Sequence, residues 1–235
     1  MEDGMGRITV IGIGPGGRDC LLPRATERIE DAELLAGSPR LIAEYGDSGK
    51  RTIEISSGWK QAAADLDLER KNTRIAVLVS GDPMLYSFTA LLLRRIPRGE
   101  VEIIPGISSF QYLAAETGMQ VSDAVLVSLH GRRNERYVQV ERLTGLVRLT
   151  RLVPRIVVFC DGEFSPARIA GIVGEAAGEN ATGAPGLWTA CIGCNLGLDS
   201  ERILRLPLDE AAHLTTDKDD LCVMILQREH QSSTA

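Results

Sequence analysis

The sequence predicts an α/β protein made of two small domains, and three observations support this. Short aliphatic and β-branched runs alternate with helical patterns, which is typical of parallel strands joined by crossover helices. The alternation restarts after a short polar segment, Thr117-Gly118-Met119-Gln120-Val121-Ser122. The chain has 235 residues, 44% of them hydrophobic, which is enough for two small cores. We therefore expect an N-terminal α/β domain over residues 5–117 and a C-terminal α/β domain over residues 118–235.

The first half begins with a predicted strand at residues 7–13, a β-branched run that ends in glycines and is typical of a buried strand. A helix follows at residues 22–31, with Pro23 in its first turn, where a missing N–H is tolerated. Further strands are expected at 33–36, 52–55, 75–80 and 101–104, and further helices at 39–45, 59–70, 86–95 and 109–116. This order predicts a mostly parallel sheet.

The second half repeats the alternation less regularly. Strands are expected at residues 125–129 and 156–160, with an arginine-rich helix between them, and a helix follows at 166–177. Later strands are expected at 187–192, 203–206 and 221–226, with a short helix near 209–213. These spacings are too irregular for an internal repeat.

Charge is distributed unevenly along the chain. The net charge is −6, and the 26 basic residues comprise 22 arginines and four lysines. Residues 130–155 hold seven arginines and two acids, a local charge of +5 that leaves −11 for the remainder. An acidic protein with one basic segment argues against general nucleic-acid binding and for a local anionic ligand. The alternative is an arginine-rich helix that faces solvent.

The sequence contains no signal peptide and no apolar run long enough for a membrane span, so we expect a soluble, cytoplasmic protein. Its five cysteines are then free thiols. Cys191 and Cys194 form a CxxC pair, but Cys20, Cys160 and Cys222 stand apart in the sequence and there are only three histidines. We therefore expect no metal site.

A glycine-rich loop, Gly12-Ile13-Gly14-Pro15-Gly16-Gly17, follows the first strand and satisfies the dinucleotide fingerprint G-x-G-x-x-G. Pro15 removes one backbone N–H from this loop, and the acids near the second strand precede that strand instead of following it. The sequence therefore argues against a nicotinamide or flavin site.

Two more glycine-bearing loops follow the fourth and fifth strands, Ser80-Gly81-Asp82-Pro83 and Pro105-Gly106-Ile107-Ser108-Ser109. Glycine lets a ligand approach the backbone, and the Asp82 carboxylate can accept hydrogen bonds from two sugar hydroxyls or from an amine. Each loop alone could be a simple tight turn. Together, at the carboxyl ends of parallel strands, the three loops predict a ligand site.

These three loops resemble the tetrapyrrole methylase family, S-adenosylmethionine-dependent enzymes with two α/β domains and the cofactor in the cleft between them. Residues 105–115 and the run Ser128-Leu129-His130-Gly131-Arg132 resemble the subgroup that methylates carbon 5 of precorrin-7 or cobalt-precorrin-7 in cobalamin biosynthesis. Residues 161–166 and 195–203 also fit later motifs of that subgroup. The resemblance covers about residues 7–226 and implies a homodimer.

The resemblance implies that residues of both domains surround S-adenosylmethionine. They are Pro15, Gly81, Asp82, Leu85, Ser108 and Ser109, together with the backbone near Phe159 and Cys194. Cys194 departs from the subgroup, which usually has glutamate at this position. If that glutamate contacts ligand through its side chain, the contact is altered here; if only its backbone matters, cysteine is harmless.

The chemistry that the resemblance implies needs few catalytic groups, because a sulfonium cofactor carries its own leaving group and the protein mainly aligns the methyl. The substrate bears acetate and propionate groups, which Arg132 and Arg133 are expected to bind. His130 is the candidate proton acceptor, with a structural role as the alternative. Tyr86 and Glu163 are further candidates for substrate binding. The later arginines are expected to face solvent: Arg142, Arg148 and Arg151.

Some related enzymes continue into a second catalytic domain that methylates carbon 15 and removes a carboxyl group. This chain ends at Ala235, shortly after its last predicted strand, so we expect a separate enzyme for that step. Two alternatives stay open. One is another methyltransferase of the same fold, acting on uroporphyrinogen, diphthine or ribosomal RNA, which the Ser-Leu-His-Gly-Arg run argues against. The other is a non-catalytic anion- or nucleotide-binding module.

Overall fold

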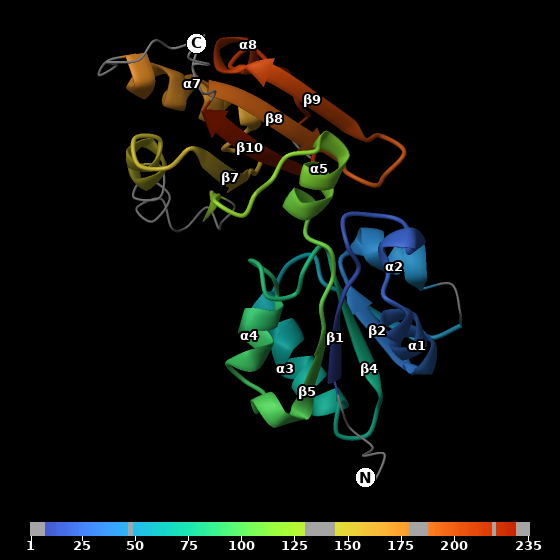
Figure 1. Cartoon of the computed structure of the whole chain (residues 1–235). Coiled ribbons are helices and arrows are strands. Elements are labelled where there is room, and N and C mark those ends of the chain that lie inside the picture. The colour runs from blue at the N-terminus through green and yellow to red at the C-terminus, as the bar shows by residue number, and fades with distance from the viewer. Residues whose placement is uncertain (1–7, 47–48, 130–143, 179–187, 218–219, 229–235) are drawn as a thin grey trace. The chain divides into compact units, whose positions relative to one another are not determined.

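The computed structural model describes residues 8–46, 49–129, 144–178, 188–217 and 220–228. The chain divides into two compact units, residues 1–108 and 109–235, and each is built around one five-stranded sheet (Figure 1). Within the described ranges, every helix is too short or too polar to cross a lipid bilayer.

The sheet of the first unit is parallel throughout, which confirms the prediction from the alternating pattern. Its strand order is β3-β2-β4-β1-β5. The strands are β1 (Ile8–Gly12), β2 (Leu34–Gly37), β3 (Arg51–Glu54), β4 (Ile75–Val79) and β5 (Val101–Ile104). The central strands β1 and β4 are buried along their whole length, which explains their uninterrupted apolar sequences, whereas the edge strand β3 is largely exposed.

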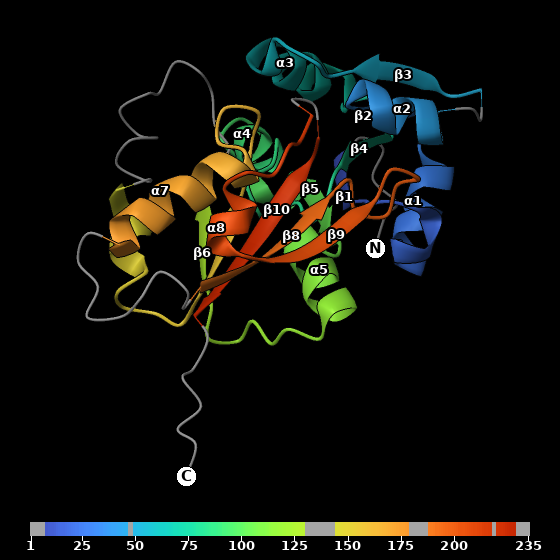
Figure 2. The same cartoon turned by 90° about the horizontal axis from the view of Figure 1, so that it is seen from above.

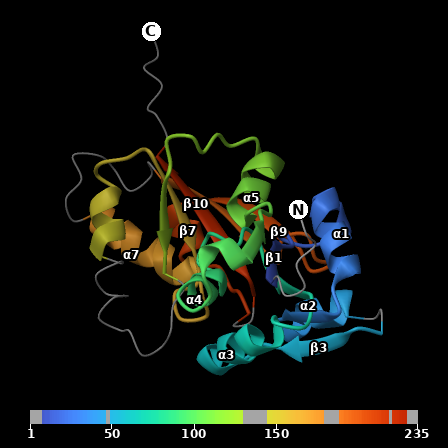
Figure 3. The ribbon, with the colours of Figure 1, turned by 90° about the horizontal axis from the view of Figure 1, so that it is seen from below.

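Helices cover both faces of this sheet. They are α1 (Pro23–Asp31), α2 (Pro39–Tyr45), α3 (Trp59–Glu69) and α4 (Thr89–Leu93), with short 3₁₀ helices η1 (Arg18–Cys20) and η2 (Arg98–Glu100). α1 and α2 bury Ile29 and Leu41 against one face, and α3 and α4 bury Leu66 and Leu92 against the other. Accordingly, α1 and α4 lie on opposite sides of β1 (Figures 1 and 3).

The helix expected at residues 86–95 is shorter than predicted. It is confined to Thr89–Leu93, because Tyr86 takes a left-handed backbone conformation, with a φ of 52°, that cannot continue a right-handed helix. Ser87 ends the loop, since its Oγ accepts a hydrogen bond from the backbone N–H of Thr89 at 3.1 Å. Such a φ costs a non-glycine residue about 1–2 kcal/mol, so the surrounding loop must hold Tyr86 in place.

The second sheet is mixed, so the parallel arrangement does not extend to the second unit. Its order is β6-β7-β10-β8-β9, and only the β6–β7 pair is parallel. The strands are β6 (Val125–Ser128), β7 (Arg155–Phe159), β8 (Trp188–Cys194), β9 (Arg202–Pro207) and β10 (Cys222–Arg228). Figures 1 and 2 show β10, β8 and β9 as neighbouring arrows. The connection from β8 to β9 is too short for a crossover, so these strands must run antiparallel.

Helices also cover both faces of the second sheet. α5 (Ser109–Thr117) packs on one face through Leu113 and Ala114. α7 (Pro166–Gly178), α8 (Leu208–Ala211) and the helical residues 144–149 pack on the other. The contacts of α5 therefore belong to the second unit, and the boundary between the two units lies before this helix, at residues 108 and 109. Gly118, with a φ of 67°, instead closes α5, because the N–H of Met119 donates to the carbonyl of Ala114 at 2.9 Å.

Candidate functional site

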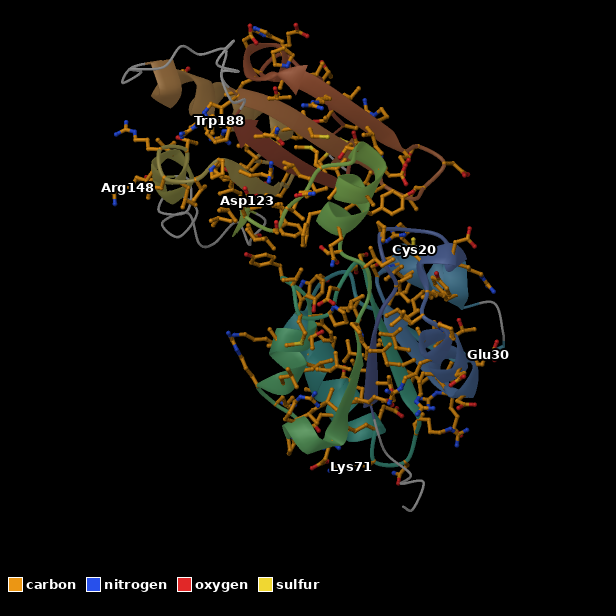
Figure 4. All side chains as sticks on the ribbon, in the orientation of Figure 1. Cys20, Glu30, Lys71, Asp123, Arg148 and Trp188 are labelled. Atoms are coloured by element: carbon orange, nitrogen blue, oxygen red, sulfur yellow. The ribbon has the colours of Figure 1, made fainter. Side chains whose placement is uncertain are left out.

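Three glycine loops meet at the carboxyl edge of the first sheet. A Cβ on Gly12 would lie 2.6 Å from Gly106 N and from Gly81 O, and 2.7 Å from Pro83 Cδ. These distances are far below a van der Waals contact, so the three backbones touch only because Gly12 and Gly106 have no side chain. Figure 4 labels Cys20, which follows the first loop at this end of the unit, and Lys71 at the opposite end.

The first two loops are also hydrogen-bonded to each other. Gly81 N donates to Gly14 O at 2.9 Å, and Ile13 N donates to Val79 O at 2.9 Å. Pro15 is buried directly after this bridge. The loop leads only into the three-residue 3₁₀ helix η1, whose N-cap is Gly17, and the α-helix α1 begins later, at Pro23. The geometry therefore differs from a dinucleotide-binding turn, where the loop leads into a helix N-terminus.

Hydrogen bonds within the loop after β4 fix its conformation. Asp82 Oδ1 accepts a hydrogen bond from Met84 N at 2.7 Å, and Leu85 N donates to Asp82 O at 3.2 Å. Asp82 and Leu85 are half-buried, and Tyr86 is 52% exposed. The structure thus brings together Gly81, Asp82, Leu85 and Tyr86, four of the predicted site residues.

A cavity of about 190 Å³ lies beside this loop at the same sheet edge. Its walls come from the ends of β2 and β4, the start of α2 and α3, and the loop that precedes α4. The lining includes Ser38, Trp59, Ser80, Leu85 and Tyr86. Apolar walls with a few polar groups at the carboxyl ends of parallel strands are typical of a small-molecule site.

Arg40 is a candidate that the sequence reading missed. Its Nη2 donates to Ser80 Oγ, a wall of the cavity, at 3.0 Å. Its Nη1 lies 3.6 Å from a Glu44 carboxylate oxygen and is buried without a hydrogen bond among the residues that the structure describes. A buried guanidinium N–H without an acceptor is costly, which suits a ligand carboxylate as its partner. The sequence gives one indication of this role, which is the position of Arg40. It lies in the first turn of α2, directly after β2, at the carboxyl edge of the sheet where the glycine loops also lie.

Three further predicted residues lie in the second unit. Ser109 begins α5, Phe159 ends β7 and packs on the α5 face, and Cys194 ends β8 with its side chain on the opposite face. The ring of Phe110 packs edge-on against Phe159 at 6.2 Å between centroids. A Cβ on Gly193 would lie only 3.1 Å from Leu113, so β8 and α5 are in close contact. Ser108, the last residue of the first unit, is 2% exposed.

The remaining predicted residues have different outcomes. Glu163 is exposed and pairs with Arg168 at 3.7 Å in the loop that begins α7. Arg148 and Arg151 are exposed, as expected, and Figure 4 shows Arg148 pointing away from the ribbon. Four of the predicted residues lie outside the described residues: His130, Arg132, Arg133 and Arg142.

A comparison with protein families decides what kind of protein carries this geometry. The sequence profile described as Tetrapyrrole (Corrin/Porphyrin) Methylases matches residues 7–212. The chain belongs to the tetrapyrrole methylase family. This tetrapyrrole methylase is therefore an enzyme, and the family uses S-adenosylmethionine.

One curated relative resembles this tetrapyrrole methylase over most of its length. The cobalt-precorrin-7 C(5)-methyltransferase of Salmonella typhimurium is 32% identical over 202 residues, which cover 86% of this chain and 90% of the relative. Solved structures share the fold at lower identity. The methyltransferase CobJ has a TM-score of 0.75 at 20% identity, covering 95% of this chain and 94% of CobJ. The uroporphyrin-III C-methyltransferase of Thermus thermophilus, solved with S-adenosylhomocysteine, has a TM-score of 0.67 at 20% identity, covering 94% and 92%.

The tetrapyrrole methylase also brings together three cysteines that are distant in sequence, Cys160, Cys194 and Cys222. Cys222 lies opposite Cys194 in the β10–β8 pair, and Cys160 N donates to Cys222 O at 3.2 Å. A hydrogen bond with Cys222 lowers the pKa of Cys194, while the same bond and burial raise the pKa of Cys222. From the sequence alone Cys160 and Cys222 are predicted to be isolated thiols, because the spacing of residues along the chain does not show which residues face each other on paired strands.

Proposed function

We propose that this tetrapyrrole methylase transfers a methyl group from S-adenosylmethionine to ring carbon 5 of a precorrin-7-type corrinoid precursor, with the cobalt form as the favoured substrate. The observation that carries this proposal is the 32% identity to the Salmonella cobalt-precorrin-7 C(5)-methyltransferase over 86% of the chain. The converging glycine loops support it, because they build a ligand site where such a cofactor needs close backbone approach.

The proposed division of roles follows the two units. In the first, Gly81, Asp82 and Leu85 contact the cofactor, and Pro15 and Ser108 support the loops around it. In the second, Ser109 and the backbone at Phe159 and Cys194 complete the cofactor contacts. We assign the substrate contacts to the following residues: Arg40, Tyr86, His130, Arg132, Arg133 and Glu163.

The chemical step makes modest demands on the protein. The methyl leaves the sulfonium as the ring carbon attacks it, so the protein contributes alignment and exclusion of water. After transfer, a proton must leave the methylated ring, and we assign its acceptance to His130, whose ordinary pKa range lies near neutrality. Arginine side chains hold the substrate through its carboxylates.

The direct test incubates the protein with S-adenosylmethionine labelled in the methyl group and a precorrin-7-type substrate, with and without cobalt. Mass spectrometry with fragmentation, or carbon NMR of the product, locates the new methyl. The proposal expects one labelled methyl at carbon 5. Labelling at another ring carbon, or cofactor binding without transfer to either substrate, would contradict it.

Arg40→Ala is expected to raise the KM for the tetrapyrrole roughly 10-fold, because it removes one charge-assisted hydrogen bond to a substrate carboxylate. Cofactor binding should stay within about 2-fold of the unmodified protein, since the guanidinium contacts Ser80 and Glu44, which are not among the assigned cofactor residues. Arg74→Ala is the matched control, because Arg74 precedes the opposite end of β4 and pairs with Glu33 at 3.6 Å. Equal KM values for the two variants would remove Arg40 from the substrate site.

We also propose a homodimer and a separate enzyme for the carbon-15 step. Light scattering coupled to size-exclusion chromatography tests the first, with twice the chain mass of 25.5 kDa as the expected result. Product analysis tests the second, since this protein alone should add one methyl and release no carbon dioxide.

A further inference from the structure

The row of cysteines in the second sheet is set by strand register. Cys222 on β10 lies directly opposite Cys194 on β8, and the next residue, Val223, lies opposite Phe159 on β7. Cys160 follows Phe159 and hydrogen-bonds to Cys222 through its backbone. Residues directly opposite each other in antiparallel strands point to the same face, so all three thiols share one face of the sheet.

The packing supports this placement. Cys160 and Cys194 are buried in the core on the α7 face, and Cys222 packs against that core at its margin. Cys191 lies on the opposite face, in the core beneath α5, although it is only three residues from Cys194. The CxxC spacing in the sequence therefore joins two thiols that cannot act together. The thiols that share one face, Cys160, Cys194 and Cys222, belong instead to the ends of three different strands.

Asp220 adds an oxygen ligand to this row. It precedes Cys222 by two residues, and the ligand atoms of Cys194, Asp220 and Cys222 all lie within 4.8 Å of one another. Its carboxylate is fixed in place, because Oδ1 accepts from Asn195 Nδ2 at 2.7 Å and Oδ2 accepts from Asp217 N at 3.0 Å and from Arg202. Each carboxylate oxygen has two lone pairs, and the two bonds at Oδ2 use both of them, so Oδ1 is the oxygen that can still bind a metal while these bonds orient the group.

We propose that Cys194, Cys222 and Asp220, with Cys160 as the fourth ligand, form a binding site for a thiophilic divalent cation, Zn²⁺. Zinc–sulfur bonds of about 2.3 Å and zinc–oxygen bonds of about 2.1 Å in a tetrahedron place ligand atoms roughly 3.5 Å apart, so small side-chain movements bring Cys194, Asp220 and Cys222 to this spacing. The Cys160 thiol, which donates to Val158 O at 3.7 Å, must give up that contact to become the fourth ligand. Each thiol that binds the ion loses its proton to solvent as the zinc–sulfur bond forms. This inference goes beyond the proposed methyl transfer and does not rest on it.

The surroundings suit a charged site at the margin of a core. Arg202, which lies opposite Cys194 in the β9–β8 pair, offsets part of the negative charge of the thiolates and the carboxylate. Cys222 and Asp220 are half-buried and border a cavity of about 40 Å³, which gives an ion a route inward. A bound ion would join β7, β10 and β8.

The test titrates the reduced, full-length protein with Co²⁺ as a spectroscopic probe for zinc. We expect sulfur-to-cobalt charge-transfer bands in the near ultraviolet and the visible bands of tetrahedral cobalt, saturating at one ion per chain and disappearing when Zn²⁺ is added. Cys222→Ser should weaken zinc binding by more than the roughly 10–100-fold that loss of an outer-shell partner costs. Cys191→Ala and Cys20→Ser are the matched controls and should keep the bands, because their thiols lie on the other face and in the other unit.

A measurement on the unmodified protein protects the test against a variant that fails to fold. Cys160 and Cys194 are shielded by burial in either state, so the informative thiol is Cys222, which is half-buried. With Zn²⁺ present, Cys222 in the folded protein should react more slowly with iodoacetamide, as followed by mass spectrometry, while Cys20 is modified as before. The proposal is overturned if cobalt gives no charge-transfer band, if the bands survive Cys222→Ser, or if zinc leaves the alkylation of Cys222 unchanged.

Discussion

Replacing Asp82 with alanine is expected to weaken S-adenosylmethionine binding by roughly 100-fold or more. We assign the Asp82 carboxylate two hydrogen bonds to the cofactor, and each bond to a charged group contributes about 1.5–3 kcal/mol. Losing two costs at least about 3 kcal/mol, which corresponds to roughly two orders of magnitude in affinity. The variant also loses the bond from Met84 N that shapes the loop. Isothermal titration calorimetry measures the effect directly.

Two further variants separate the possible causes of this loss. Asp82→Asn can still accept the hydrogen bond from Met84 but carries no charge, so it should keep the loop and bind the cofactor with intermediate affinity. Arg132→Ala should leave cofactor affinity unchanged and weaken only tetrapyrrole binding. The reverse pattern, with Asp82→Ala affecting the tetrapyrrole and Arg132→Ala the cofactor, would overturn the assignment of both residues.

Gly106→Ala is expected to destabilise the first unit by about 3 kcal/mol, at the upper end of the usual cost of overpacking. The added Cβ would lie 2.7 Å from Gly12 C and 2.8 Å from Gly12 Cα, and closer still to Gly81 O. These are backbone atoms of two other loops, so no side chain can rotate away to make room. For a chain of this length the cost corresponds to a fall in Tm of roughly 6–12 °C.

Gly99→Ala supplies the control for this substitution. Gly99 lies exposed in η2, and a Cβ there would meet nothing within 4 Å. Its effect on the free energy of unfolding should stay within about 0.5 kcal/mol. Thermal unfolding followed by circular dichroism compares the two variants, and equal Tm values would show that the glycine loops do not need their close approach.

The sequence predicts the first unit well because its signals are local. Uninterrupted apolar runs identify β1 and β4, which are buried on both faces, and alternating helices require parallel strands. The late start of α4 could not be predicted, because the left-handed backbone at Tyr86 depends on its loop. The antiparallel half of the second sheet could not be predicted either, since strand direction there depends on pairings between distant segments.

The same distinction applies to the candidate site. Each glycine loop follows a strand, so the sequence alone places all three at one sheet edge. Arg40 was missed because its significance lies in a contact with Ser80 on another strand. The row of Cys160, Cys194 and Cys222 was missed because it depends on the register of three strands whose sequences are far apart.

The position of β10 has a consequence for synthesis on the ribosome. This strand is the last of the second sheet in chain order, yet it lies between β7 and β8 and hydrogen-bonds to both. Until residues 222–228 emerge, the segments of β6–β7 and β8–β9 each present an unpaired inner edge. The second unit must therefore complete its sheet late, whereas the first can fold while the chain is still growing. Chains that end before residue 222 should accordingly bind holdase chaperones more strongly after release from the ribosome than released chains that include residues 222–228.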